Sequence, residues 1–218
     1  MATTASPLRS AGPGRPKDME KHAAILAAAK ALFGERGYAG TSMDTVARKA
    51  SVSKLTVYSH FGDKDGLFRA AVRERCAELF PEDLYLANEH TSVEQALRNI
   101  ARHHAQLMTS KESIGVWRAI SSDRSGHGPQ LGRLLWEEGP ERVHALLGDF
   151  LRDLDRRGKL AVEDPSRAAT QFMALLKGDL HLKRMLGCEG GDCSGFEREV
   201  EQNAMAAVDM FLRAYRPC

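Results

Sequence analysis

Apolar side chains recur at spacings of three and four residues along most of this chain of 218 residues. That spacing places them on one face of an α-helix, whereas a half-buried strand alternates apolar and polar positions. The first clear example follows Asp18, where Ile25, Ala29, Leu32 and Phe33 fall on one face. No segment alternates in the manner of a strand. The pattern therefore predicts an all-α protein.

Capping and breaking residues mark where several predicted helices begin or end. Thr91-x-x-Glu94 and Ser194-x-x-Glu197 have the spacing of a capping box. Asp164-Pro165 pairs a cap with a proline at the first helical position. Gly37 suits the left-handed position after the first helix. The predicted helices cover residues 18–33, 42–49, 53–60, 64–80, 91–110, 112–122, 130–157, 165–186 and 194–215.

Two of these helices, 42–49 and 53–60, are short and are separated by a turn at 50–52. Helices joined in this way form a helix-turn-helix, whose second helix enters the DNA major groove with its N-terminal residues at base edges. Val57 and Phe61 supply the apolar back of the second helix. Its polar residues are Ser53, Lys54 and Thr56, placed for bases or nearby phosphates, and Tyr58 and His60, placed for the DNA backbone.

The charge distribution agrees with a DNA-binding N-terminal third. Residues 1–75 contain 13 lysines and arginines against 7 acidic residues, and the remainder contains 18 against 22. A basic unit on an acidic body fits a phosphate-binding head on a body that binds something else. Chance unevenness is the alternative that this count leaves open.

Residues 24–72 carry a more specific signal, because many fixed spacings occur in one nearly unbroken stretch. They resemble the DNA-binding domain of the TetR (tetracycline-repressor-like) family of transcriptional regulators. The strongest pieces are Phe33…Gly37-Tyr38, Thr41-Ser42…Val46-Ala47, and Val52-Ser53-Lys54…Thr56…Tyr58…His60-Phe61…Lys64…Leu67-Phe68.

The resemblance implies roles for individual residues. Thr41 or Ser42, with Tyr58, His60 and Lys64, would contact phosphates, and Lys54, Leu55 and Thr56 would face bases. Taken singly, these residues are also compatible with packing, helix capping or solvated surface charge. The resemblance further implies a homodimer on a near-palindromic double-stranded operator and release by a ligand. Repression is the family default, although the residues themselves do not distinguish a repressor from an activator.

Two positions depart from the family pattern. Ser51 stands in the turn where the family usually has glycine, and a left-handed conformation there costs about 1 kcal/mol. Leu55 stands where relatives often have a smaller residue. A bulky apolar side chain there would favour thymine methyl groups or exclude some bases, so the operator sequence cannot be taken from relatives.

The sequence divides into three predicted regions. Residues 1–17 lack periodicity and are expected to be a disordered basic arm, either lying on DNA or acting as a mobile tail. Residues 18–75 form the helix-turn-helix DNA-binding domain. Residues 76–218 form a helical effector-binding and dimerisation domain.

Residues 76–218 carry no sequence motif as specific as that of residues 24–72. Apolar stripes on the last helix (Val200, Ala204, Ala207, Val208, Phe211, Tyr215) and the preceding one (Phe172, Leu175, Leu176, Met185) could pair about a two-fold axis or close the chain's own core. We favour the dimer interface, because the family dimerises in this way. The predicted pocket residues are Trp117, Arg118, Trp136, Phe172, Met173 and His181, although each alone is more typical of core or surface. The absence of a charged cluster suggests an apolar or amphipathic effector.

Other functional classes find little support. No phosphate loop, hydrolase elbow or zinc-protease motif is present, so no enzymatic activity and no cofactor are expected. His103 and His104 are adjacent on one helix and face different directions, so no metal site is expected. Cys188 and Cys193 leave open a thiol sensor, and a protein partner could also replace the small effector. Without a signal peptide or membrane span, a cytoplasmic location is expected.

Overall fold

The computed structural model describes residues 14–85, 91–121, 126, 128–188 and 193–217. In these ranges every regular element is helical, which confirms the all-α prediction. The helices are α1 (Gly14–Arg36), α2 (Met43–Lys49), α3 (Lys54–Phe61), α4 (Lys64–Leu79), the 3₁₀ turn η1 (Glu82–Tyr85), α5 (Val93–Thr109), α6 (Lys111–Ser121), α7 (Gly128–Glu138), α8 (Pro140–Arg156), α9 (Pro165–Lys177), α10 (Leu180–Leu186) and α11 (Cys193–Ala214).

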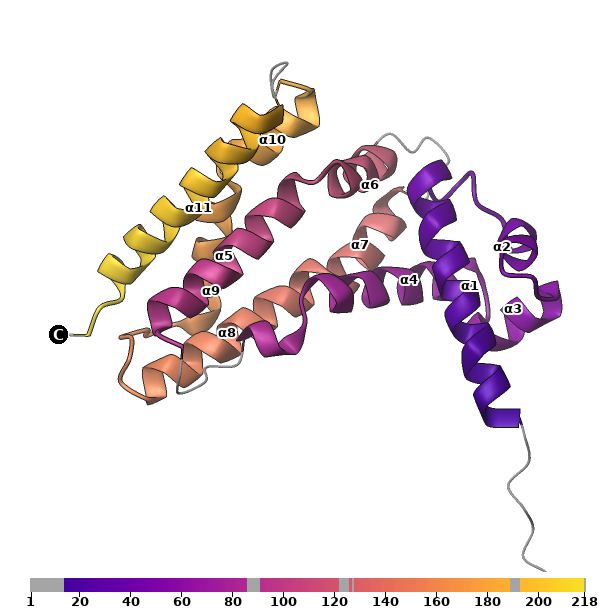
Figure 1. Ribbon diagram of the computed structural model, residues 1–218, viewed down its shortest axis with the longest axis horizontal. Coiled ribbons are helices and arrows are strands. Elements are labelled where there is room, and N and C mark those ends of the chain that lie inside the picture. Colours follow the sequence, from indigo (N-terminus) through magenta and orange to yellow (C-terminus); the bar gives the residue numbers. More distant parts are fainter. Residues whose placement is uncertain (1–13, 86–90, 122–125, 127, 189–192, 218) are drawn as a thin grey trace, which may run out of the picture.

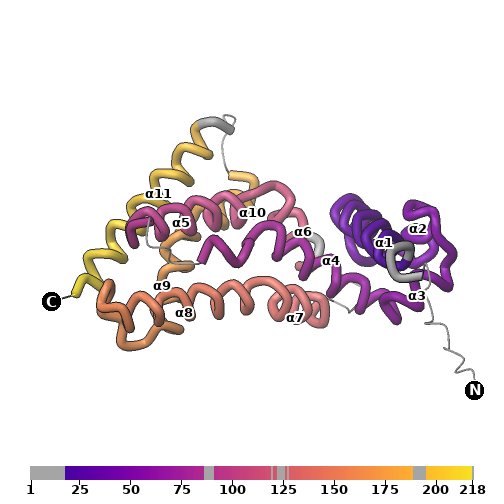
Figure 2. The backbone as a smooth tube through the Cα atoms, turned by 60° about the horizontal axis from the view of Figure 1, so that its bottom comes forward, coloured from indigo at the N-terminus to yellow at the C-terminus, as the bar shows by residue number. Residues whose placement is uncertain are grey.

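A small head and a long body make up the molecule. Helices α1, α2 and α3 form the head at one end, and α4 leads from it into the body (Figure 1). The turned view shows α7 at the head end of the body and α8 continuing from it along the body, away from the head (Figure 2). The predicted domain boundary at residue 75 therefore falls inside α4, and α1 begins within the segment 1–17 predicted to be disordered.

Two long predicted helices are each divided in the structure. The segment 130–157 breaks at Gly139, because Pro140 lacks an N–H group and occupies the first turn of α8. A Cβ at Gly139 would lie 3.0 Å from the Leu135 carbonyl oxygen and 3.1 Å from Cys76 Sγ, so the break also suits close packing against α4. The segment 165–186 breaks at Gly178, which has a φ of +46°.

Two predicted helix starts are shifted by one residue. The side chain of Ser92, not Thr91, accepts the N–H of Gln95 and caps α5. Helix α11 already begins at Cys193, so Ser194 lies inside its first turn and does not precede it. Capping residues next to one another in the sequence offer alternative starts, and packing selects between them.

The head and the body have separate hydrophobic cores. The head core contains Ile25 and Leu32 of α1, Val57 of α3 and Leu67 of α4. Leu131 and Leu134 of α7 also belong to it, although α7 lies far along the sequence. The body core is built from α5, α8, α9 and α11. Among the described residues of the head and the body, no helix is both long enough and apolar enough to cross a bilayer.

The apolar stripe of α11 lies inside the body core. Val200, Ala204, Val208 and Phe211 are buried against α5 and α9 within one chain. The ring of Phe211 meets that of Phe172 on α9, with centroids 4.8 Å apart. The preference for these stripes as the dimer interface is therefore contradicted for most of their side chains, which the chain's own core covers. Leu175, Met185 and Tyr215 are only half-buried.

A buried carboxylate joins α4 to α7. The side chain of Glu138 is 9% exposed and lies 2.7 Å from Arg73 Nε and 3.1 Å from Arg69 Nη1. The hydrogen bond from Arg73 lowers the pKa of Glu138, and the positive charge of Arg73 and the bond from Arg69 act in the same direction. The ion pairs therefore connect the helix that leaves the head to a helix of the body.

Replacing Glu138 by glutamine is expected to lower the free energy of unfolding at pH 7 by about 1–2 kcal/mol, since Arg73 loses its charged partner and Arg69 loses one of two. The pKa of Glu138 in the folded state lies below its ordinary value of 4.5. The stabilisation is therefore present above about pH 4.5 and is lost as the pH falls through the folded-state pKa. Urea unfolding at several pH values should show wild type and Glu138→Gln converging in acid.

Glu137 provides the matched control, because it lies next to Glu138 but is 39% exposed and reaches Arg69 only at 3.4 Å. Glu137→Gln should cost less than about 0.5 kcal/mol. Equal losses for the two variants would show that the link between α4 and α7 does not depend on the buried carboxylate.

Candidate nucleic-acid interface and cavity

The helix-turn-helix is built from local capping interactions. Ser42 accepts the N–H of Thr45 at the start of α2, and Thr45 Oγ1 accepts the N–H of Ser42 at 3.0 Å. The side chain of Ser53 accepts the N–H of Thr56 at 3.0 Å at the start of α3. Between the helices, the N–H of Val52 donates to the carbonyl of Ala47 at 3.0 Å. The two helix starts and the turn are thus specified by nearby residues.

Helix α3 presents most of its side chains to solvent. Val57 alone of its residues is buried, while Leu55 is 79% and Tyr58 is 40% exposed. Lys54 Nζ lies 3.0 Å from Asp44 on α2, and that hydrogen bond raises the pKa of Lys54. A helix with one buried residue contributes little to the core, so its exposed face is available for another role.

Lys64 lies at the start of α4, close to α3. Its Nζ atom is 4.1 Å from the centre of the Tyr38 ring, and burial lowers its pKa. The hydroxyl of Tyr38 donates to Asp65, and burial raises its pKa. The side-chain amide of Gln130 donates to the other oxygen of Asp65 at 2.6 Å. The cation is therefore held at a helix N-terminus, where backbone N–H groups also favour phosphate.

Two predicted DNA contacts are placed differently. Thr41 is 2% exposed, and its hydroxyl lies within hydrogen-bonding distance of the Leu32 and Gly37 carbonyls. Thr41 therefore anchors the loop after α1, and of the two alternatives only Ser42 faces outward. The side chain of His60 is 12% exposed and lies 3.1 Å from Asp18 on α1. His60 consequently has an intramolecular partner in the position predicted to meet phosphate.

Ser51 adopts the left-handed conformation with a φ of +56°. It has the only positive φ among non-glycine residues of the described chain. Ser51→Gly should therefore raise the free energy of unfolding by about 0.5–1 kcal/mol in urea denaturation. Ser51→Ala is the control, because it retains the Cβ atom and the strain and should gain nothing. Equal gains for both variants would contradict backbone strain as the cause.

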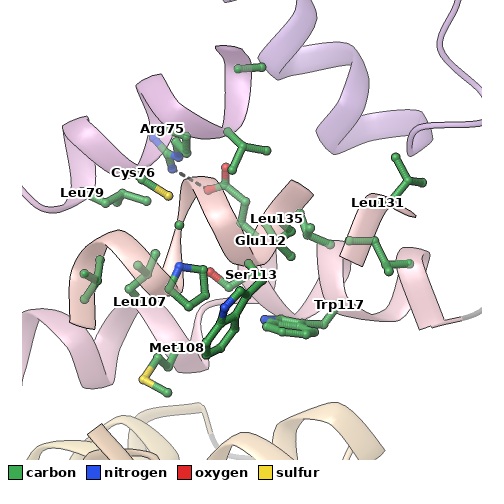
Figure 3. Close-up of a pocket in the computed structure, with 18 of the residues that line it drawn as sticks. Arg75, Cys76, Leu79, Leu107, Met108, Glu112, Ser113, Trp117, Leu131 and Leu135 are labelled. Carbon is green, nitrogen blue, oxygen red and sulfur yellow. Dashed lines mark hydrogen bonds and ion pairs between the residues drawn. The ribbon is translucent and has the colours of Figure 1, made fainter. Parts of the chain in front are cut away.

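A cavity of about 710 Å³ lies between the head and the body. Its wall includes residues of α1 and α4 as well as body helices α5 to α10. Leu107, Met108, Trp117 and Leu135 line it, and an ion pair between Arg75 and Glu112 is also at its wall (Figure 3). Such a volume with a mostly apolar wall is typical of small-molecule sites.

The predicted pocket residues separate into two groups. Trp117, Trp136, Met173 and His181 line the cavity. Phe172 does not, because its ring packs against Phe211 within the body core. Arg118 does not either: its guanidinium donates to the Arg184 and Met185 carbonyls and ties α6 to α10. These last two predictions were wrong, since aromatic or cationic character alone does not show which way a side chain faces.

Sequence reasoning missed other wall residues, notably His104 and Cys76. His104 was considered only as part of a metal pair, and the described residues contain no group of three or more potential metal ligands. Burial raises the pKa of Cys76 to about 11. The spacing of Cys76 from Val72 and Leu79 on α4 places the three on one helix face, and this was the sequence signal available for it.

Comparison with known proteins decides the family. Residues 95–217, more than half of the chain, match the family described as AefR-like transcriptional repressor, C-terminal domain. Residues 25–71 match bacterial regulatory proteins of the tetR family. The chain belongs to the TetR family. Its DNA-binding head and helical body are those of a transcriptional regulator of this family.

Individual relatives match most of the chain. The HTH-type transcriptional regulator BetI of Paraburkholderia xenovorans is 30% identical over 72% of this chain and 78% of its own. A TetR-family regulator from Mesorhizobium loti is 32% identical, with a TM-score of 0.76 over 91% of this chain and 98% of its own. The Flavonoid-responsive Regulator FrrA is also 32% identical, with a TM-score of 0.70 over the same shares.

Proposed function

We propose that this TetR-family protein is a cytoplasmic repressor that binds a palindromic operator as a homodimer and is released by a small molecule. The observation that carries the DNA-binding part is the exposed face of α3, where Leu55 is 79% exposed beside Lys54 and Thr56. A folded protein gains nothing from leaving such a residue in water, whereas a major groove offers thymine methyl groups to it.

The proposed contacts follow the geometry of the head. Lys54, Leu55 and Thr56 lie in the first turn of α3, the part of a recognition helix that reaches base edges. Ser42, Ser53, Tyr58 and Lys64 are assigned to phosphates. His60 is assigned to a phosphate contact that requires its interaction with Asp18 to break. Thr41 is assigned a structural role, because its buried hydroxyl holds the loop after α1.

The cavity supports control by a small molecule. Its wall includes Ala71, Val72 and Cys76 of α4, the helix that begins with Lys64. A molecule bound there contacts the connection between head and body, so the spacing of two recognition helices in a dimer can depend on its presence. The name of FrrA supports a flat aromatic effector, in agreement with the two tryptophans on the wall.

The outer face of α9 and α11, which includes the half-buried Leu175 and Tyr215 of these stripes, is proposed as the dimer interface. A hollow there is lined by Gln171, Ala174, Leu175, Met210 and Ala214, among others. Met210 is 59% exposed although it is apolar. A hollow on an apolar surface beside one projecting methionine suits a self-complementary contact between two helix pairs.

Control by thiol oxidation is the less favoured alternative. Cys188 is exposed, but the side chain of Cys193 lies outside the described residues. The raised pKa of Cys76 keeps its thiol protonated, which slows oxidation. Alkylation of the purified protein with unchanged operator affinity would remove this alternative.

Selection of bound duplexes from a random DNA pool tests the proposed function. The expected result is a palindrome whose half-sites are about one helical turn apart, or an overlapping variant of that spacing. Enrichment of a single half-site would contradict the dimer. With the fold verified and low salt, a pool without enrichment would contradict specific DNA binding itself.

A further inference from the structure

His104 is a buried polar side chain on the wall of the otherwise mostly apolar cavity. It extends from α5, is fully buried, and is one of the residues that line the cavity. The ring of Phe80 stacks on it with centroids 4.3 Å apart. Its Nε2 atom lies 2.7 Å from the hydroxyl of Tyr85, which is also buried. The ring is thus held in one orientation from two sides.

The second ring nitrogen, Nδ1, has no hydrogen-bond partner among the described residues. Leaving a buried polar atom unpaired costs on the order of 1–3 kcal/mol, so such atoms are rare and call for a reason. Within the described part of the chain, the other two buried side-chain atoms without a hydrogen bond belong to Glu74 and Arg75, whose charged groups form ion pairs. Among these three, His104 Nδ1 is the atom whose side chain has no charged partner.

The contact with Tyr85 indicates which ring nitrogen carries the proton. A neutral imidazole has one donor and one acceptor, and a buried phenol hydroxyl needs an acceptor for its proton. Nε2 is that acceptor at 2.7 Å, which places the imidazole proton on Nδ1. Burial lowers the pKa of His104 to about 3, so the ring is neutral at physiological pH. Nδ1–H is therefore a fixed, uncharged donor.

We propose that the Nδ1–H group of His104 donates a hydrogen bond to an oxygen acceptor, such as a ketone, on an uncharged aromatic ligand in this cavity. The inference rests on the proposed control by a small molecule and names the chemical class that the site selects.

The aromatic and methionine side chains of the wall agree with this class. Trp117 offers a ring face and Met108 an adaptable apolar contact (Figure 3). Trp136 and Met173 also line the cavity. The Arg75 and Glu112 side chains neutralise each other at 2.6 Å. A neutral histidine cannot compensate a carboxylate, so the environment of His104 favours an uncharged oxygen over an anion.

A matched pair of probes separates this hydrogen bond from plain apolar binding. Benzophenone and diphenylmethane have the same two rings, joined by a carbonyl in the first and by a methylene in the second. Titration calorimetry with the full-length protein should give an affinity for benzophenone roughly 10-fold higher, the value of one buried hydrogen bond. Quenching of tryptophan fluorescence should accompany binding, because both tryptophans of the chain line the cavity.

Two isosteric variants locate the donor. A glutamine at 104 can reach the Tyr85 hydroxyl but offers nothing at the Nδ1 position, whereas an asparagine places an amide near Nδ1 and loses Tyr85. In His104→Gln the ratio of the affinities for benzophenone and diphenylmethane should therefore fall to about 1. His104→Asn should retain part of the preference for benzophenone. His103→Gln is the control, because His103 is adjacent on α5 but does not line the cavity; its preference should match wild type.

Several outcomes overturn the proposal. Equal affinity of wild type for the two probes, or binding of neither, would show that the cavity does not select a carbonyl. An unchanged preference in His104→Gln would place the donor elsewhere, and equal loss in the Gln and Asn variants would indicate only a structural role. Operator release is measured separately, so ligand selection by His104 and effector control of DNA binding can fail independently.

Discussion

Lys64→Ala is expected to weaken binding to every duplex, by roughly 30-fold at 0.15 M salt, because one phosphate contact is lost in each half of a dimer. The slope of the logarithm of affinity against the logarithm of salt concentration should flatten by about 1.8. The physical reason is the position of Lys64 at the N-terminus of α4, held against the ring of Tyr38 at 4.1 Å. Fluorescence anisotropy across a salt series measures both quantities.

Lys159→Ala is the matched control, since it removes the same charge from an exposed position at the far end of the body. Its slope should stay at the wild-type value, and Lys64→Arg should restore most of the affinity. A base contact behaves differently: Leu55→Ala should change the ranking of sequences while leaving the slope unaltered. An unchanged slope in Lys64→Ala would show that Lys64, at the start of α4, does not contact a DNA phosphate.

Met210→Glu is expected to convert the protein to monomers and to reduce operator affinity by roughly 100-fold or more, because two linked half-site contacts become independent. The side chain is 59% exposed in the single chain, so the protomer itself should fold normally. In the proposed interface, however, the new carboxylate would be buried without a partner. Light scattering after size exclusion gives the mass, and anisotropy with the selected operator gives the affinity.

Gln106→Glu offers a control for added charge, because Gln106 is exposed on α5 and lies outside the hollow between α9 and α11. This variant should remain dimeric with wild-type affinity. Ala174→Glu, on the opposite wall of the hollow, should reproduce the effect of Met210→Glu. A dimeric Met210→Glu protein would place the contact between copies on another face.

Local interactions explain why the head could be predicted from sequence. The caps at Ser42 and Ser53 act over three residues, and the turn at Ser51 is fixed by bonds to the preceding helix. What sequence could not show was the surroundings of each side chain. Thr41 has the composition of a surface residue, yet it is enclosed beneath the loop after α1.

Nonlocal packing explains the errors in the body. The stripe of α11 has the same sequence pattern whether it meets another chain or its own α5, and only the tertiary structure distinguishes the two. The same limit applies to the cavity. Trp117 and Phe172 are equally plausible from their type, but one lines the cavity and the other fills the core. His104 became visible as a candidate only through an unpaired atom.

The presence of Leu131 and Leu134 in the head core has a consequence for exchanging parts between regulators. A segment ending after α4 would expose the apolar surface that these two leucines cover, and would therefore be less stable than the head in the whole chain. A chimera that joins this head to the body of a relative must also carry the inner face of α7. In evolution the same requirement couples substitutions in α4 to substitutions in α7, a helix far downstream in the sequence.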